Sequence, residues 1–153
     1  MADADAPALT DAEIERIGNS LVPPDLPSAP PRDPFDRRLL LLAVSGGVDS
    51  MALMHIVAKS VGAMRRAHIL VATVDHALRA ESAEEARFVH AEAARIGLEH
   101  VTLVWQGSKP ATGIQEGARA ARYQLLANVY HDQLFPEKTL VTAHTLDDQA
   151  ETV

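Results

Sequence analysis

The hydrophobic pattern of this chain alternates between short apolar runs and longer segments with helical periodicity. The clearest runs are residues 39–44 and 67–74, in which apolar side chains follow one another almost without interruption. Such runs are typical of strands that are buried on both faces of a parallel sheet. Two further strands are predicted at residues 99–105 and 138–143. Because strands and helices alternate, we expect an α/β fold of the Rossmann-like, doubly wound type, in which a mainly parallel sheet has helices on both faces.

Three helices are predicted in the segments between these strands. The first contains the apolar run 51–61, directly after the first strand. The second begins at a capping box formed by Ser82 and Glu85. The third begins at a cap formed by Thr112 and Gln115. The core stripe of this third helix consists of Ala118, Ala121, Leu125 and Val129.

The first 36 residues form an arm that differs from the rest of the chain in charge and proline content. They carry eight acidic and two basic residues, so most of the net charge of −7 lies there, together with seven of the nine prolines. Thr10 and Glu13 form a capping box that predicts a short helix to about Val22. The proline-rich stretch 23–34 is expected to be an extended or disordered connector without a function of its own.

Length and composition narrow the class of protein. Residues 37–153 are long enough for one domain with a substantial core, and they are nearly neutral, so charge alone neither requires nor excludes a nucleic-acid partner. The absence of cysteine excludes a disulfide framework, a thiolate metal site and a catalytic thiol from this chain. The N-terminus lacks a signal-peptide pattern and no apolar run reaches membrane-spanning length. We therefore expect a cytoplasmic protein with no membrane contact.

The candidate chemistry begins in the turn between the first strand and the first helix, whose residues are Ser45, Gly46, Gly47, Val48, Asp49 and Ser50. Glycines let a backbone approach a ligand closely, and the free N–H groups of a first helical turn bind anions. The turn lacks the lysine of a Walker loop and the third glycine of a dinucleotide fingerprint. Its carboxylate, Asp49, instead suggests a Mg²⁺ ion shared with phosphate groups. The alternative is an ordinary turn in which Asp49 only caps the helix.

The string SGGVDS resembles the pyrophosphate-binding loop of the N-type ATP pyrophosphatases. These enzymes split ATP into AMP and pyrophosphate to adenylate a substrate oxygen, and a nucleophile then displaces AMP. The resemblance implies that ATP is a substrate, that Mg²⁺ is the cofactor and that residues 45–50 bind ATP. Asp75 and His76 end the second strand, at the sheet edge where parallel sheets bind their ligands. Their string VDHALR resembles the VDHxLR segment of tRNA-modifying members of this group, which implies that both residues belong to the nucleotide pocket.

Two arginines of the third predicted helix are candidates for the same site. At 100° per residue, Arg122 lies about 40° from Ala118 within the apolar stripe, and Arg119 lies about 100° away on the same side. An arginine on an apolar face is costly unless it is paired, and pairing with structural acids is the alternative to a role in the site. The string EGARAARY resembles the EaaARxxRY signature of tRNA(Ile)-lysidine synthetases, except that Gly117 stands where the family usually has alanine. The resemblance implies that Arg119 acts on the adenylated intermediate and that Arg122 binds ATP.

The fourth string, TAHTLDDQAET, follows the last predicted strand and matches TAHxxDDxxET of the same synthetases. Asp148 and Glu151 are three residues apart and share one helical face, which indicates either complementation of the helix dipole or a pocket for a cation, magnesium or an amine. By the resemblance, His144 belongs to the ATP pocket, and Asp148 and Glu151 hold and orient the lysine substrate. Family members continue well beyond Val153, so we expect a fragment of a longer enzyme that does not modify tRNA alone.

Together the four strings imply a two-step reaction. ATP with Mg²⁺ adenylates O2 of the wobble cytidine in an isoleucine tRNA with a CAU anticodon, and the ε-amine of free lysine then displaces AMP at C2 to give lysidine. The residues that the resemblance makes catalytic are Asp49, Arg119, Asp148 and Glu151. Two alternatives stay open: a related tRNA 2-thiolation enzyme and a non-catalytic ATP-binding α/β module. The sequence also leaves a homodimer open.

Overall fold

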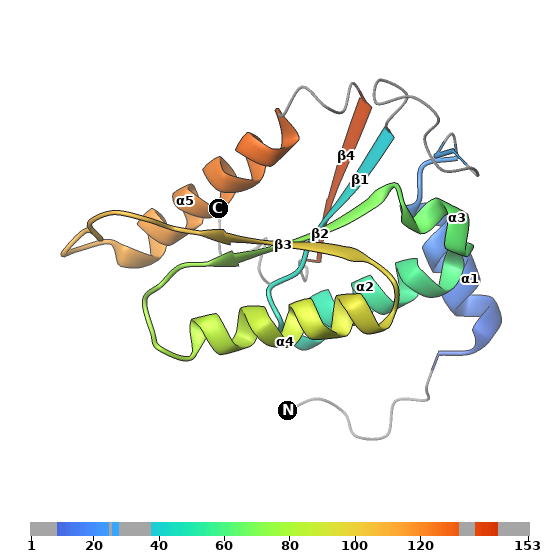
Figure 1. Ribbon diagram of the computed structural model, residues 1–153, viewed down its shortest axis with the longest axis horizontal. Helices are drawn as coiled ribbons and strands as arrows, with labels where there is room; N and C mark the ends of the chain where they lie inside the picture. The colour runs from blue at the N-terminus through green and yellow to red at the C-terminus, as the bar shows by residue number, and fades with distance from the viewer. Residues whose placement is uncertain (1–8, 25, 28–37, 132–136, 144–153) are drawn as a thin grey trace.

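The computed structural model describes residues 9–24, 26–27, 38–131 and 137–143 of the chain. In chain order, and as labelled in Figure 1, its elements are α1 (Asp11–Leu21), β1 (Arg38–Ala43), α2 (Val48–Ser60), α3 (Ala63–Arg66), β2 (Ile69–Asp75), α4 (Ser82–Arg95), β3 (Glu99–Val104), α5 (Ile114–Tyr130) and β4 (Glu137–Thr142). Each predicted strand is present within two residues of its expected bounds. The helix after β1 begins three residues earlier than its apolar run, which brings Asp49 and Ser50 into the first helical turn.

The strands form a parallel sheet in the order β3-β2-β1-β4. Helices α2 and α4, which connect β1 to β2 and β2 to β3, cover one face, whereas α5 covers the other (Figure 1). This arrangement confirms the predicted doubly wound α/β fold. The chain moves outward from β1 to β3 and then crosses to the opposite side of β1, so the strand order reverses at β1. Ligands of such sheets bind outside the carboxyl ends of the strands at this reversal.

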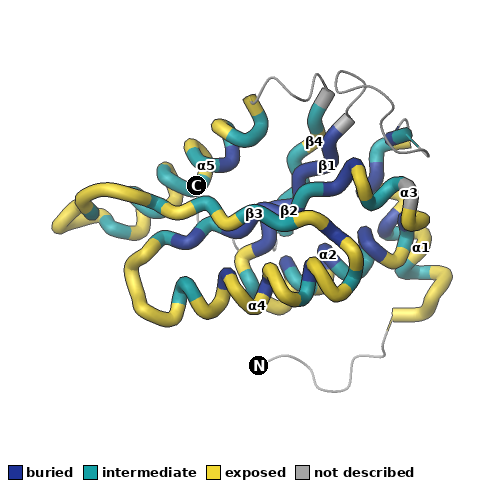
Figure 2. Tube along the Cα trace, viewed as in Figure 1, coloured by how far each residue is buried: buried dark blue, intermediate teal, exposed yellow. Residues whose placement is uncertain are grey.

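The core consists of two layers, one on each side of the sheet. Because successive strand residues point to opposite faces, Leu40 and Leu42 of β1 pack with α2 and α4, while Leu41 packs with α5. Figure 2 shows the buried positions concentrated in the central strands and on the sides of the helices that face them. On α5 the fully buried residue is Leu126, and Leu125 of the predicted stripe is only partly buried.

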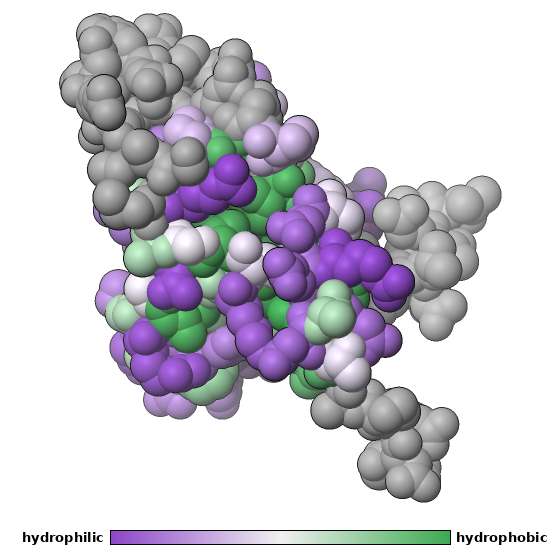
Figure 3. Space-filling view, turned by 90° about the vertical axis from the view of Figure 1, so that its right-hand side faces the viewer, coloured by the Kyte–Doolittle hydropathy of each residue, from purple (hydrophilic) through white to green (hydrophobic). Residues whose placement is uncertain are grey.

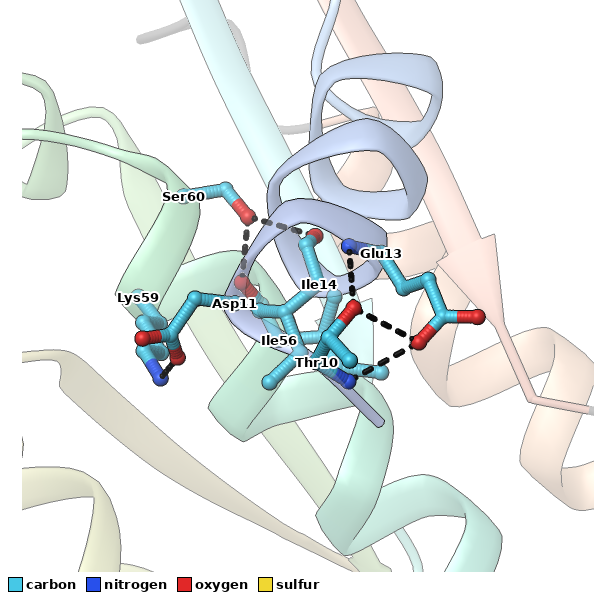
Figure 4. A network of polar contacts seen from close by, with 7 residues as sticks. All are labelled: Thr10, Asp11, Glu13, Ile14, Ile56, Lys59 and Ser60. Atoms are coloured by element: carbon cyan, nitrogen blue, oxygen red, sulfur yellow. Dashed lines mark hydrogen bonds and ion pairs between the residues drawn. The ribbon is translucent and has the colours of Figure 1, made fainter. Parts of the chain in front are cut away.

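Two of the three predicted helix caps are wrong. The capping box at Thr10 is present: the Glu13 backbone N–H donates to Thr10 Oγ1 at 3.3 Å, and the Thr10 N–H donates to the Glu13 carboxylate at 2.9 Å (Figure 4). At α4 the cap position is Glu81 without a side-chain bond, because the Ser82 hydroxyl is turned toward Asp75. At α5 the cap position is Gly113, in the left-handed conformation with φ of 66°, and no side chain caps the helix.

Helix α1 packs against α2 through a close backbone contact. The Ser60 hydroxyl lies 2.7 Å from the carbonyl oxygen of Ile56 in its own helix and 3.2 Å from that of Ile14 in α1 (Figure 4). Lys59 and Asp11 form an exposed ion pair at 2.5 Å. Gly18 is buried at the contact, so the helices approach without a side chain between them.

The segment after α1 also contributes to the main core. Val22 and Leu26 are buried in the cluster that contains β1 and α2. Figure 3 shows this end of the molecule, on the side of α1 and α3, where hydrophilic residues surround the hydrophobic ones that reach the surface. None of the helices in the described part of the chain combines the length and apolarity that a membrane span requires.

The contact at Gly18 gives a prediction for stability. A Cβ at position 18 would lie 1.7 Å from Ser60 Oγ and 2.2 Å from Ser60 Cβ, so Gly18→Ala must move α1 away from α2. We expect a loss of about 1–3 kcal/mol from overpacking, although alanine is the better helix former. At roughly 2–4 °C per kcal/mol for a domain of this size, calorimetry should detect the lower Tm. The exposed neighbour Asn19→Ala is the control and should leave the Tm unchanged; a Gly18→Ala protein that melts at or above the parent would contradict the packing argument.

Candidate functional site

The turn between β1 and α2 is closed by a ring of hydrogen bonds between its two serines. Ser50 Oγ donates to the carbonyl oxygen of Gly47 at 2.9 Å and accepts the N–H of Ser45 at 3.1 Å. Because the Ser50 proton is used in this way, Ser45 Oγ is the donor in the 3.2 Å contact between the two hydroxyls. Ser45 Oγ also accepts the Gly47 N–H at 3.4 Å. The hydrogen bonds of this ring lie wholly within the turn and fix its shape locally.

The same turn leaves the start of α2 open to a ligand. Gly46 has φ of 91°, a left-handed conformation that favours glycine, and Gly47 occupies the cap position without a side-chain bond. Val48 is 85% exposed, and Asp49 beside it is also exposed. The first-turn N–H groups of an uncapped helix carry partial positive charge and are suited to an anion such as a phosphate.

A cavity of about 200 Å³ adjoins this turn at the carboxyl edge of the sheet. Its floor is apolar because Ala43 at the end of β1 and its register partner Ala72 within β2 have small side chains, whereas Leu41 fills the core on the same face. Leu126 closes the cavity from α5. The polar and charged residues that line it are Ser45, Thr73, His76, Arg79, Ser82, Glu85 and Arg122. Sequence reasoning did not place Arg79, Ser82 or Glu85 in the site, although all three lie within ten residues of the end of β2.

Asp75 organises the wall of the cavity rather than lining it. Its side chain is buried, with the residue 8% exposed, and Oδ1 accepts the Ser82 hydroxyl at 2.6 Å and the Ala77 N–H at 2.8 Å. The bond from Ser82 is the main reason that the pKa of the Asp75 carboxyl is lowered, with the Ala77 N–H adding to it against burial. The ionised carboxylate thus holds the turn after β2 in place, including Ala77 with its positive φ of 50°. This turn carries His76 into the cavity wall.

The surroundings of His76 favour the neutral form of its imidazole. Burial lowers its pKa, and the positive charge of Arg122 lowers it further, against the opposing effect of Asp75. Nδ1 of His76 is buried and has no hydrogen-bond partner among the described residues. The ring of Trp105 lies edge-on to the imidazole, with 6.1 Å between the ring centroids.

The two candidate arginines of α5 occupy different surroundings. Arg122 is partly buried and lines the cavity. Arg119 is exposed, and its guanidinium lies 5.6 Å from the centre of the Tyr123 ring, outside the cavity lining. The difference follows the helical wheel, in which Arg122 lies nearer to the apolar stripe than Arg119.

The last group of predicted site residues, His144, Asp148 and Glu151, lies outside the described residues. The structure does fix where that segment starts, because Thr142 at the end of β4 is in register with Ala43 at the end of β1. Residues that follow Thr142 therefore leave the sheet at the same edge as the serine turn.

The chain has clear relatives among curated proteins. It is similar to the tRNA(Ile)-lysidine synthase of Methylobacterium sp. (strain 4-46), at 54% identity over 114 residues that make up 74% of this chain and 32% of the relative. The proteins of the same name from Rhodopseudomonas palustris and Methylobacterium nodulans are 53% and 49% identical over 115 and 136 residues, which cover 74% and 80% of this chain and 33% and 38% of the relatives. The match thus spans about a third of the length of these relatives.

The comparison with domain families covers the whole sheet. A family described as the PP-loop domain matches residues 20–153, a range that includes the serine turn, the cavity and every strand of the described structure. The chain therefore belongs to the PP-loop domain family.

Proposed function

We propose that the protein to which this chain belongs is a tRNA(Ile)-lysidine synthase. It uses ATP to join free lysine to C2 of the wobble cytidine in an isoleucine tRNA with a CAU anticodon, and it releases AMP and pyrophosphate. The observation that carries the proposal is the uncapped serine turn beside the cavity, at the point where the strand order reverses. Family membership supports the use of ATP, and the names of the relatives support the tRNA substrate.

In this proposal the triphosphate lies on residues 45–50 and the adenosine lies in the adjoining cavity. Backbone N–H groups at the start of α2 bind the departing pyrophosphate and offset the charge that develops on it. The apolar floor at Ala43 and Ala72 suits a flat base, and Arg122 on the cavity wall suits the α-phosphoryl group that is transferred.

Asp49 is the residue that we propose for magnesium. Its carboxylate is exposed on the first turn of α2, beside the N–H groups that would bind phosphate. Within the described ranges no three His, Asp or Glu side chains converge on a metal site. A magnesium ion commonly has only one or two protein carboxylates and takes its other ligands from phosphates and water, so a single Asp49 fits. When bound, the ion would neutralise charge on the phosphates.

We assign the second step to a residue of α5 and to residues that follow β4 in the sequence. We propose that Asp148 and Glu151 bind the ammonium group of lysine and that a carboxylate takes its proton, so that the neutral amine attacks as the nucleophile, with His144 near the nucleotide. Their segment starts at the end of β4, beside the serine turn. Arg119 is exposed on α5 and is available to a group outside the cavity, such as the adenylated cytidine.

We propose that the reaction takes place in the cytoplasm, that residues 37–153 belong to the catalytic domain and that residues 1–36 precede that domain. Contacts to the tRNA are expected largely in the part of the protein that lies outside this chain, because the match covers only about a third of the relatives. A homodimer stays an open proposal.

The magnesium assignment predicts the behaviour of Asp49→Ala. Loss of this carboxylate should weaken the binding of ATP with Mg²⁺ about tenfold or more, because the bridge between protein, ion and phosphates is gone. Isothermal titration calorimetry on the full-length protein measures the affinity. Glu99→Ala removes an exposed carboxylate at the opposite end of the sheet and should bind ATP normally. Equal affinity for Asp49→Ala and Glu99→Ala would exclude Asp49 from the site.

The overall reaction predicts transfer of lysine to tRNA. Full-length protein with ATP, Mg²⁺, radiolabelled lysine and isoleucine tRNA bearing a CAU anticodon should label the tRNA, and the label should vanish without ATP or when the wobble cytidine is replaced. Asp148→Asn should abolish labelling while ATP binding is retained, since the residue is assigned to lysine alone. Release of AMP and pyrophosphate without label would keep the ATP chemistry and reject lysine as the nucleophile. Neither label nor ATP cleavage would reject the enzyme assignment.

A further inference from the structure

The segment that connects β3 to α5 is built against the cavity wall. The Trp105 N–H donates to the carbonyl oxygen of Asp75 at 2.8 Å, which extends the pairing of β3 with β2 by one residue. This bond places the indole beside His76, where its edge meets the imidazole at an interplanar angle of 90°. Trp105 does not line the cavity, so its contact with the site runs through His76.

Lys109 contacts both the ring and the backbone of Trp105. Its ammonium group lies 4.1 Å from the centre of the Trp105 ring and donates a hydrogen bond to the Trp105 carbonyl oxygen. A lysine over an aromatic face is attracted by the ring quadrupole, and a backbone acceptor fixes its position further. Residues 105–109 therefore form a compact unit.

Gly117 of α5 makes room for this unit. A Cβ at position 117 would lie 3.0 Å from Pro110 Cγ and 3.4 Å from Trp105 Cη2. The first distance is tighter than an ordinary contact, so a methyl group here requires Pro110 to shift by a few tenths of an ångström. Gly117 has helical geometry and no positive φ, hence the requirement comes from packing and not from the backbone.

We propose that Trp105 is a positioning residue for His76. The lack of a side chain at Gly117 lets Trp105 take up its place beside that histidine. In this arrangement the imidazole is held in the cavity wall with Nε2–H available to donate to the bound nucleotide. The assignment of the proton to Nε2 follows from Nδ1, which is buried without a partner among the described residues and is less costly as a bare acceptor than as an unpaired N–H. The inference rests on the proposed function in taking ATP as the ligand.

The charges around His76 favour the neutral donor. Arg122 from α5 and Lys109 from the connecting segment lower its pKa, and Asp75 from β2 raises it, while burial has the largest effect and lowers it. The Trp105 ring lies against the imidazole in a T-shaped contact. Removing the indole should therefore admit water and let the pKa of His76 rise toward its ordinary value near 6.5.

The first test needs no nucleotide. NMR titration of full-length protein with ¹³C-labelled histidine, with the His76 signal assigned by His76→Gln, should give a pKa below 6.5 in the parent protein and in Trp105→Phe, and a raised pKa in Trp105→Ala. An unchanged His76 pKa in Trp105→Ala would overturn the positioning role. Because this measurement contains no ATP, its outcome does not depend on whether the proposed function is correct.

The second test separates positioning from simple stabilisation. Gly117→Ala should raise or preserve the Tm, because alanine favours the helix, and yet should weaken the binding of ATP with Mg²⁺ about tenfold. Gly62→Ala is the matched control, since a Cβ there meets nothing within 4 Å, and it should bind as the parent does. Trp105→Ala should weaken binding to a similar extent, and Trp105→Phe should largely restore it. Normal ATP affinity in both Gly117→Ala and Trp105→Ala would reject the inference, whereas loss of affinity in Asp49→Ala in the same assay would keep the ATP site itself.

Discussion

The parallel pairing of β1 with β2 on one side and β4 on the other is the constraint on which the rest of the structure depends. It brings the carboxyl ends of β1, β2 and β4 to one edge of the sheet, with α2 and α4 on one face and α5 on the other. The space at that edge exists because Ala43 at the end of β1 and its register partner Ala72 in β2 have small side chains, while Leu41 fills the core on the same face. A larger side chain at Ala43 or Ala72 would extend the core into the cavity. The position of the site is therefore a consequence of how the strands are packed.

Two groups of hydrogen bonds then shape the walls of that space, one in the serine turn and one around Asp75. In the serine turn, the hydroxyls of Ser45 and Ser50 bond to backbone groups of the turn and to each other. They do not cap α2, so its first-turn N–H groups stay open to a ligand. After β2, the buried charge of Asp75 is satisfied by Ser82 and by the Ala77 N–H. An unpaired buried carboxylate would be expensive, so the turn is held firmly in the conformation that pairs it. Both groupings are internal to their loops, which leaves the cavity side free for a ligand.

Much of this could be predicted from the sequence, because the apolar runs of β1 and β2 are long and bounded by clear turns. The fold class, the strands and the capping box at Thr10 followed from pattern alone. The cap at Ser82 could not be predicted correctly, since local preference is outweighed when a partner such as Asp75 competes for the hydroxyl. At α5 the helix begins one residue later than a cap at Thr112 requires, after Gly113 in the left-handed conformation. The helical wheel places Arg122 nearer to the apolar stripe than Arg119, but only the packing of α5 shows that Arg122 lines the cavity and Arg119 does not. The roles of Asp49 and Arg119 stay predictions, and those of His144, Asp148 and Glu151 concern residues outside the described ranges.

Gly117 shows how a departure from a family pattern acquires a physical meaning once the neighbours are known. From sequence alone, glycine in place of alanine only weakens a helix, by about 0.5–1 kcal/mol. In the structure, Pro110 and Trp105 pack closely against Gly117, where a methyl group would crowd them. Trp105 in turn contacts His76. A loss of local helix stability is thus offset by contacts that reach the cavity through two aromatic rings. Because the contact involves residues on both sides, glycine at 117 and the proline at 110 form a coupled pair, and the effect of changing one depends on the other.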